Sequence, residues 1–208
     1  MLTTVTPGKV YVASKKFRGP HATPLDPRAV KVDVTSAQAT ASANRRDFSP
    51  MTPNQDGYRG FWNFESFWQS GKVFEGLDHR TSKLWWIQQK APKRRYPNSK
   101  GKKVLYAKWD HTRPLGYVES RKQVYVPEYS AMIADREMLK YWKDQVARGV
   151  NVTIYDFDGP KLPDGSITCC ELTKELLQEK INDETHPFGH GYIVAAMIAG
   201  INVDEYIM

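Results

Sequence analysis

The segment over residues 150–157, with the sequence VNVTIYDF, constrains the fold more than any other part of the chain. Its β-branched and aromatic residues predict a strand at the centre of a sheet. The strand runs into Asp156-Phe157-Asp158-Gly159-Pro160, so two carboxylates stand near its carboxyl end. Such a pair can bind a metal ion with a phosphate, or act in acid–base chemistry. The same residues also form an ordinary strand-terminating turn, and both interpretations stay open.

The rest of the chain predicts further strands and several helices. Residue patterns predict strands or strand-like segments over residues 9–14, 29–34, 103–108 and 116–126. Helical periodicity and boundary signals predict helices over residues 79–90, 128–148, 172–182 and 192–201. The stretch 37–55 predicts irregular backbone with a short helix over residues 37–43. Together these segments indicate an α+β fold, rich in helix around a small central sheet.

Length and composition suit one compact domain over residues 1–208. Of the 208 residues 40% are hydrophobic and 12% aromatic, so the chain can bury a sizeable core. We expect neither a membrane span nor a signal peptide, because no apolar run approaches about 18 residues and the first residues lack an apolar stretch. The only cysteines, Cys169 and Cys170, are neighbours, which indicates reduced thiols. We therefore expect a cytoplasmic protein that has no membrane partner and needs no metal or other cofactor.

An aromatic segment over residues 61–76, FWNFESFWQSGKVFEG, carries three polar residues on one line. A helix capped by Asn63 places Glu65, Gln69 and Lys72 on a single face at i, i+4 and i+7. Aromatic side chains cover both flanks of that face, which favours a polar line that looks into a cleft. A carboxylate, an amide and an ammonium in such a cleft can bind and polarise a ligand. The alternative is a half-exposed helix with one salt-bridge pair.

Positive charge is concentrated in residues 83–108, which hold nine Lys or Arg and no acidic residue. The net charge of +7 makes an anionic partner plausible, and the segment interleaves its charges with aromatic residues. One interpretation is a solvated basic loop, inserted around residues 91–103. The other is a phosphate-binding surface with aromatic platforms for nucleic-acid bases. The phosphate contacts would be Lys93, Arg94, Arg95, Lys102 and Lys103.

Two short polar segments stand at predicted element ends. Asp33, Thr35 and Ser36 follow the second strand, where ligand contacts are common and where ordinary turns also begin. Gly189 and Gly191 flank His190 and allow close backbone approach, and a helix that begins at Pro187 would offer free N–H groups to an anion. His186 and His190 are four residues apart, but the intervening Pro187 and Gly189 argue against a regular helical pair of metal ligands.

Several of these segments together resemble a known superfamily. The run Glu65-Ser66-Phe67-Trp68-Gln69-Ser70-Gly71-Lys72 resembles the E-x-[aromatic]-[aromatic]-Q-x-x-K motif of the NADAR superfamily, named for its link to NAD and ADP-ribose metabolism. The segments 33–36, 49–50, 120–129 and 189–191 are similar to further motifs of a bacterial and viral branch. Two features depart from the pattern. The family's Trp shortly before the Gly-rich segment is missing, with Asp183 and Glu184 as the nearest acidic residues there, and the basic loop has no counterpart.

The resemblance implies an N-glycosidase that hydrolyses an ADP-ribose or phosphoribosyl N-glycosidic bond, with ADP-ribosylated nucleic acid as one substrate class. Glu65 would stabilise a cation-like sugar and activate water, by analogy with glycoside hydrolysis. Lys72 would hold a phosphate or assist the leaving base, and Asp156 or Asp158 would supply the second acid. The expected substrate-binding residues are Trp62, Trp68, Gln69, Asp33, Thr35, Ser36, Arg121, Gly189, His190 and Gly191.

Two other functions remain open from the sequence. The first is a non-catalytic nucleic-acid-binding or virion-associated protein that uses the basic segment 83–108 to hold phosphates. Such a binder would lose affinity steeply with salt, whereas changes at Glu65 and Lys72 would leave its affinity unaffected. The second is a magnesium-dependent phosphate enzyme built on Asp156 and Asp158.

Overall fold

Strand β5 (Val152–Asp156) lies inside a four-stranded sheet of order β2-β5-β1-β6. It pairs in parallel with β1 (Val10–Ser14) on one side and with β2 (Val30–Asp33) on the other, while β6 (Cys169–Glu171) runs antiparallel to β1. Ile154 lies opposite both Val12 and Val32, and all three are buried. The prediction of a central strand here is confirmed, and β6 is a strand that the sequence did not predict.

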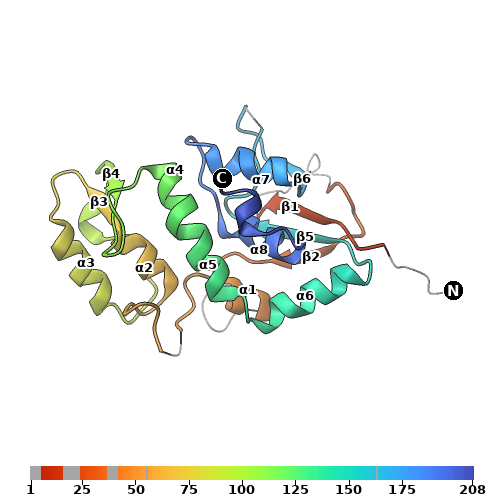
Figure 1. Cartoon of the computed structure of the whole chain (residues 1–208), viewed down its shortest axis with the longest axis horizontal. Coiled ribbons are helices and arrows are strands. Elements are labelled where there is room, and N and C mark those ends of the chain that lie inside the picture. The colour runs from red at the N-terminus through yellow and green to blue at the C-terminus, as the bar shows by residue number, and fades with distance from the viewer. Residues whose placement is uncertain (1–5, 16–23, 37–41, 55, 163) are drawn as a thin grey trace.

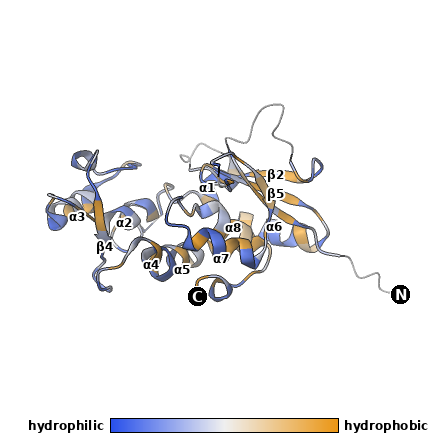
Figure 2. Cartoon of the chain, turned by 90° about the horizontal axis from the view of Figure 1, so that it is seen from above, coloured by the Kyte–Doolittle hydropathy of each residue, from blue (hydrophilic) through white to orange (hydrophobic). Residues whose placement is uncertain are grey.

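The computed structural model describes residues 6–15, 24–36, 42–54, 56–162 and 164–208. It shows an α+β fold with a small mixed sheet, as predicted. Helix α8 (His190–Ile198) packs on β1 and β5 and also contacts α5 (Val126–Ile133) and α6 (Glu137–Ala147). Every residue of α8 except Met197 is buried, and Figure 2 shows this helix as one of the most hydrophobic parts of the chain. The helices around the sheet are α1 (Ala43–Phe48), α6 (Glu137–Ala147), α7 (Lys174–Asn182) and α8 (His190–Ile198).

A second group of elements lies to one side of the sheet (Figure 1). Here β3 and β4 form a separate antiparallel pair, and α2 packs against α3. The predicted cap is confirmed, because the Asn63 side chain accepts a hydrogen bond from the backbone N–H of Ser66. The elements of this lobe are α2 (Phe64–Ser70), β3 (Lys72–Phe74), α3 (His79–Gln88), the 3-10 turn η1 (Pro97–Ser99) and β4 (Val104–Ala107).

A continuous helical segment joins the two lobes. It runs through α4 (Tyr117–Ser120), a π-helical turn η2 (Arg121–Tyr125) and α5 (Val126–Ile133). The predicted strand over residues 116–126 is therefore wrong. The buried residues Ser120, Arg121, Val124 and Tyr125 recur at the spacing of one helical face, which favours a helix over a strand.

Other element boundaries also differ from the predictions. The helix predicted over residues 128–148 is two helices, α5 and α6, separated at residues 134–136. Helix α1 lies where irregular backbone was predicted, and residues 37–41 of the short helix predicted there lie outside the described residues. Helix α8 begins at His190, with Gly189 as its N-cap, and not at Pro187. In the described part of the chain, no helix has the length and apolarity needed to cross a membrane.

Buried aromatic rings connect the helical lobe to the joining helix. Phe64 of α2 is fully buried and contacts Tyr125 and Tyr129 edge-on at 5.6 and 5.4 Å between ring centroids. The apolar cores of both lobes form one cluster through such contacts. The two lobes are therefore held together by a shared core.

We expect Phe64→Ala to lower the free energy of unfolding by about 3–5 kcal/mol, because it removes a fully buried ring and leaves a cavity. Denaturant unfolding followed by circular dichroism measures this. The matched control is Phe157→Ala, since Phe157 is 43% exposed and its loss should change stability by less than about 0.5 kcal/mol. Equal effects of the two substitutions would contradict the shared core.

Candidate functional site

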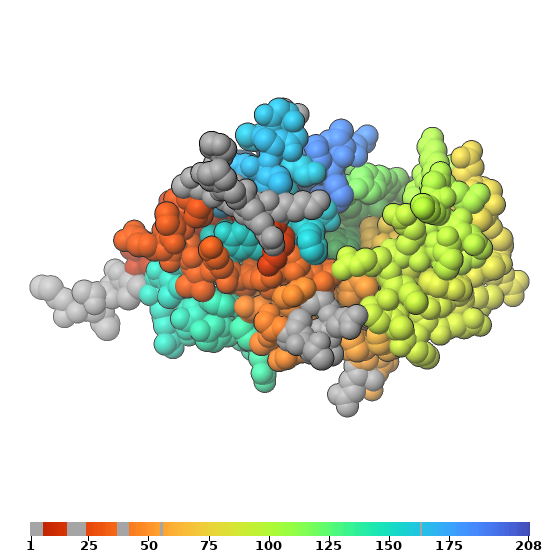
Figure 3. All heavy atoms as spheres, turned by 180° about the vertical axis from the view of Figure 1, so that it is seen from behind, coloured from red at the N-terminus to blue at the C-terminus, as the bar shows by residue number. Residues whose placement is uncertain are grey.

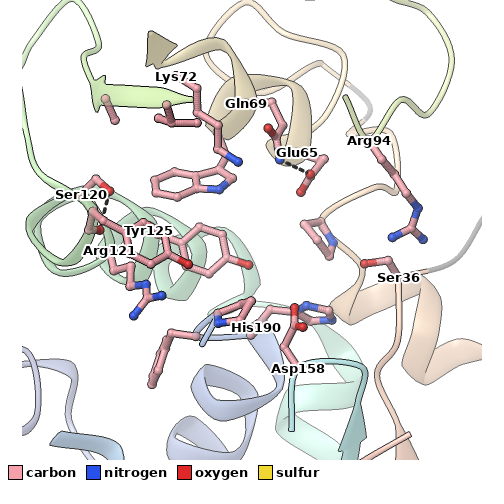
Figure 4. Close-up of a pocket in the computed structure, with 18 of the residues that line it drawn as sticks. Ser36, Glu65, Gln69, Lys72, Arg94, Ser120, Arg121, Tyr125, Asp158 and His190 are labelled. Carbon is pink, nitrogen blue, oxygen red and sulfur yellow. Dashed lines mark hydrogen bonds between the residues drawn. The ribbon is translucent and has the colours of Figure 1, made fainter. Parts of the chain in front are cut away.

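A pocket of about 420 Å³ lies between the two lobes. Figure 3 shows the surface hollowed between the yellow-green lobe and the sheet lobe, and Figure 4 shows the side chains inside. Its walls come from α2, from the β3–β4 pair, from the α4–η2 segment and from the loops that follow β5 and precede α8. Among the residues that line it are Ser36, Glu65, Trp68, Gln69, Lys72, Arg94, Arg121, Asp156, Asp158, Gly189 and His190.

Helix α2 presents Glu65 and Gln69 to the pocket, as its sequence predicted. The Gln69 amide donates a hydrogen bond of 2.8 Å to Glu65 Oε1. The backbone N–H of Glu65 donates to the carbonyl oxygen of Pro50, which ties the start of the helix to the preceding turn. Glu65 is thus held in place through both its backbone and its side chain.

Lys72 reaches the same pocket from a different element. Helix α2 ends at Ser70, so Lys72 is the first residue of β3 and the predicted i+7 position on the helix is wrong. Its ammonium makes no hydrogen bond or ion pair with any of the described residues. Burial lowers the pKa of Lys72 below its ordinary value; the Glu65 carboxylate opposes this and the Arg95 charge adds to it.

On the opposite wall, Asp156 is buried and its hydrogen-bonding capacity is used. Its Oδ1 accepts from the backbone N–H of Phe157 at 2.7 Å, and its Oδ2 accepts from the backbone N–H of Gly191 at 3.0 Å. The His190 Nδ1 atom lies 3.2 Å from the same Oδ2. These contacts give Asp156 a positioning role at the start of α8 and leave Asp158 as the exposed carboxylate of the pair.

The two glycines around His190 permit this contact. A Cβ at Gly189 would lie 2.7 Å from Asp156 Oδ2, and a Cβ at Gly191 would lie 2.6 Å from Asp156 Cβ. The close backbone approach predicted for these glycines is thereby confirmed, and its partner is Asp156. Gly189 lines the pocket, whereas Gly191 supports it from behind.

The His190 imidazole connects α8 to the end of β2. Its Nε2 atom lies 2.6 Å from the Val34 carbonyl oxygen. A carbonyl only accepts, so Nε2 carries a proton. His186 is held elsewhere, with Nδ1 3.0 Å from an oxygen of Asp183. Across the residues that the structure describes, there is no cluster of three or more His, Cys, Asp or Glu side chains suited to a metal ion.

The segment after β2 divides its predicted site residues. Asp33 and Thr35 do not line the pocket, because Asp33 accepts hydrogen bonds from the backbone and hydroxyl of Thr35 and pairs with Lys15. Burial raises the pKa of Asp33, but the hydrogen bonds from Lys15 and Thr35 outweigh it, so that pKa lies below its ordinary value. This local network places Ser36 at the pocket.

Two arginines lie on opposite sides of the pocket (Figure 4). Arg121 is buried and donates to the backbone carbonyls of Ile181, Asp183 and His186, so much of its guanidinium serves to hold that segment. Arg94 is exposed and makes no ion pair with any described residue. Both add positive charge to the pocket, and Arg94 has the greater freedom to meet a ligand.

Aromatic residues form one wall. Trp68 stacks on Trp109 with ring centroids 5.2 Å apart and contacts Tyr125 at 4.8 Å. Trp62, the other predicted stacking residue, does not line the pocket. Tyr125 was not predicted. Burial, and next the Glu65 charge, raise its pKa well above the ordinary value, so its hydroxyl stays protonated. Its i+4 spacing from Arg121 would have indicated it, had that segment been recognised as helical.

The basic loop contributes one residue to the pocket. Arg94 lines it, whereas Lys93, Arg95, Lys102 and Lys103 are exposed outside it. Buried Tyr96 and Ser99 anchor the loop, and the Ser99 hydroxyl donates to the Tyr96 carbonyl. The loop is therefore attached to the lobe and carries its charges on the surface.

The chain is thus an α+β protein of two lobes with a charged, aromatic-walled pocket between them. Residues 22–161 match the family of unknown function DUF6939, and the chain belongs to this family. Comparison with curated proteins and with solved structures found no match.

We expect Lys72→Met to raise the free energy of unfolding at neutral pH. The pKa of Lys72 is lowered in the folded protein. Burying the charged ammonium therefore reduces the free energy of unfolding in full at every pH below that lowered pKa. The advantage of Lys72→Met should shrink as the pH rises toward 10.5. Denaturant unfolding at several pH values measures it, with exposed Lys143→Met as the control. If Lys72→Met were less stable than the wild type, the burial of a charged Lys72 ammonium at a cost to stability would be contradicted.

Proposed function

We propose that this pocket hydrolyses the N-glycosidic bond of a phosphorylated ribose, and that ADP-ribose attached to a nitrogen of a base is the substrate type. The observation that carries the proposal is the convergence of Glu65 of α2, Lys72 of β3 and Asp158 of the turn after β5 in one pocket. In Figure 4, Glu65 and Asp158 face each other across an open centre, and Lys72 points toward that centre from the same side as Glu65. The resemblance of residues 65–72 to the NADAR motif supports the same chemistry.

The reaction needs a stabilised cation and two proton transfers. The bond from the anomeric carbon to nitrogen breaks, the electron pair leaves with the nitrogen, and the sugar becomes cation-like. Glu65 stabilises that charge and accepts a proton from the attacking water. Lys72 gives a proton to the leaving nitrogen. Water is thus divided between the sugar, which gains the hydroxyl, and the base, which gains the proton.

The environment of both groups suits these roles. The lowered pKa of Lys72 makes its ammonium a stronger acid than an exposed lysine. The hydrogen bond from Gln69 fixes the orientation of the Glu65 carboxylate. The protonated Tyr125 hydroxyl adds a neutral donor to the aromatic wall, and Arg94 meets the phosphates.

We expect Glu65→Gln to lower kcat/KM by about 10²–10⁴-fold, because the amide cannot accept the proton of the attacking water. The assay follows by chromatography the release of guanine and ADP-ribose from guanine-linked ADP-ribose, and the release of amine and ribose phosphate from a phosphoribosylamine. Glu75→Gln is the matched control, since Glu75 is exposed and does not line the pocket. Wild-type rates in Glu65→Gln would refute the proposal.

The role of Lys72 predicts a pH profile. Activity should fall as pH rises through the lowered pKa of Lys72, because the neutral amine cannot protonate the leaving nitrogen. In Lys72→Arg the guanidinium stays charged, so the basic limb of the kcat profile should move to higher pH while the rate at neutral pH drops. An unchanged basic limb would assign that limb to another group and remove Lys72 from the proton transfer.

A further inference from the structure

The mouth of the pocket exposes large apolar side chains. Val104, Leu105 and Tyr106 of β4 are 43%, 50% and 38% exposed, and Tyr117 and Phe157, which also line the pocket, are 51% and 43% exposed. Figure 2 shows β4 as a hydrophobic strand between hydrophilic segments. Exposed apolar groups gathered around one opening mark a surface that a partner covers.

The charges beside this apolar rim are positive, and all but one of them make no ion pair with a described residue. Of the nine Lys and Arg in residues 83–108, Lys83 alone makes an ion pair among the described residues, with Asp110. Lys102 and Lys103 immediately precede β4, and Arg94 lies on the pocket wall. A ligand for this surface therefore needs several negative charges next to flat apolar groups.

We propose that the surface formed by β4, the basic loop and the rim residues Tyr117 and Phe157 binds single-stranded nucleic acid. A single strand carries a phosphate at each nucleotide and has unpaired bases, which stack on exposed aromatic rings. A duplex offers the phosphates but keeps its bases stacked inside, and an acidic peptide does not carry an aromatic ring beside every negative charge. Tyr106, Tyr117 and Phe157 supply the platforms, and the lysines supply the phosphate contacts.

The strand-binding surface is continuous with the pocket, because Tyr106, Tyr117 and Phe157 line both. A bound strand would therefore present one nucleotide to Glu65 and Lys72. The placement of a nucleotide at Glu65 and Lys72 rests on the proposed function, whereas the binding of the strand to this surface does not.

The first test is fluorescence anisotropy of the full chain with a labelled 12-nucleotide oligothymidylate and with a matched duplex. The single strand should bind tighter than the duplex. Plotted against the logarithm of salt concentration, the logarithm of the binding constant should have a slope shallower by about 1.4 in Lys102→Ala/Lys103→Ala, about 0.7 for each lost phosphate contact. Lys143→Ala on α6 should leave the slope unchanged. Tighter duplex binding, or an unchanged slope in the double variant, would overturn the proposal.

The second test separates stacking from charge. Tyr106→Ala should weaken binding at least about fivefold, whereas Tyr106→Phe, which keeps the ring, should bind as wild type. Tyr141→Ala is the matched control, because Tyr141 is 49% exposed on α6, outside the pocket. Circular dichroism confirms that each variant is folded. Equal affinity of Tyr106→Ala and wild type would remove the aromatic platform from the proposal.

Glu65→Gln distinguishes this inference from the proposed function. The variant should keep the wild-type salt slope and the preference for a single strand, because the rim and the basic loop, and not Glu65, stack the bases and hold the phosphates. If the wild-type protein binds the oligonucleotide but hydrolyses no substrate, strand binding is supported and the proposed hydrolase activity is refuted. Loss of binding in Glu65→Gln would show that the main contacts with the strand lie inside the pocket, and would overturn their assignment to the rim and the basic loop.

Discussion

The contacts of the buried Asp156 carboxylate hold together the sheet side of the pocket. This one side chain, at the end of β5, accepts from the backbone N–H groups of Phe157 and Gly191 and lies beside the His190 imidazole, which in turn meets the Val34 carbonyl. A carboxylate buried without these partners would be strongly destabilising. The network therefore fixes the end of β2, the turn after β5 and the start of α8 together, and it sets where Ser36 and Asp158 meet the pocket.

The opposite side of the pocket is built at a cost to stability. Lys72 is desolvated and forms no ion pair with any carboxylate in the described part of the chain, and β4 exposes three apolar side chains. Shared packing of Phe64 and Trp68 with Tyr125 holds this lobe against the joining helix despite that cost. Unfavourable charge placement at a cleft, supported by a well-packed core behind it, is typical of binding and catalytic sites.

Local signals predicted the parts of the fold that depend on local physics. Strand β5 was predicted from its β-branched run, and the start of α2 from its cap Asn63. The close backbone approach at Gly189 and Gly191 was predicted because glycine has no Cβ. The π-helical turn at Arg121–Tyr125 was mistaken for a strand, because burial of that segment is decided by helices distant in sequence. Lys72 lines the pocket from strand β3 and not from the helix that was predicted to carry it. Asp33 pairs with Lys15 and does not line the pocket, since side-chain partners depend on tertiary contacts.

We propose that the pocket breaks a carbon–nitrogen bond of a ribose by adding water. Hydrolysis of guanine-linked ADP-ribose in ¹⁸O-labelled water, followed by mass spectrometry of the products, is the decisive experiment. We expect one ¹⁸O atom in the released ADP-ribose, at the anomeric carbon, and none in the released guanine. Label in a released phosphate, or no cleavage at all by the wild-type protein, would contradict it.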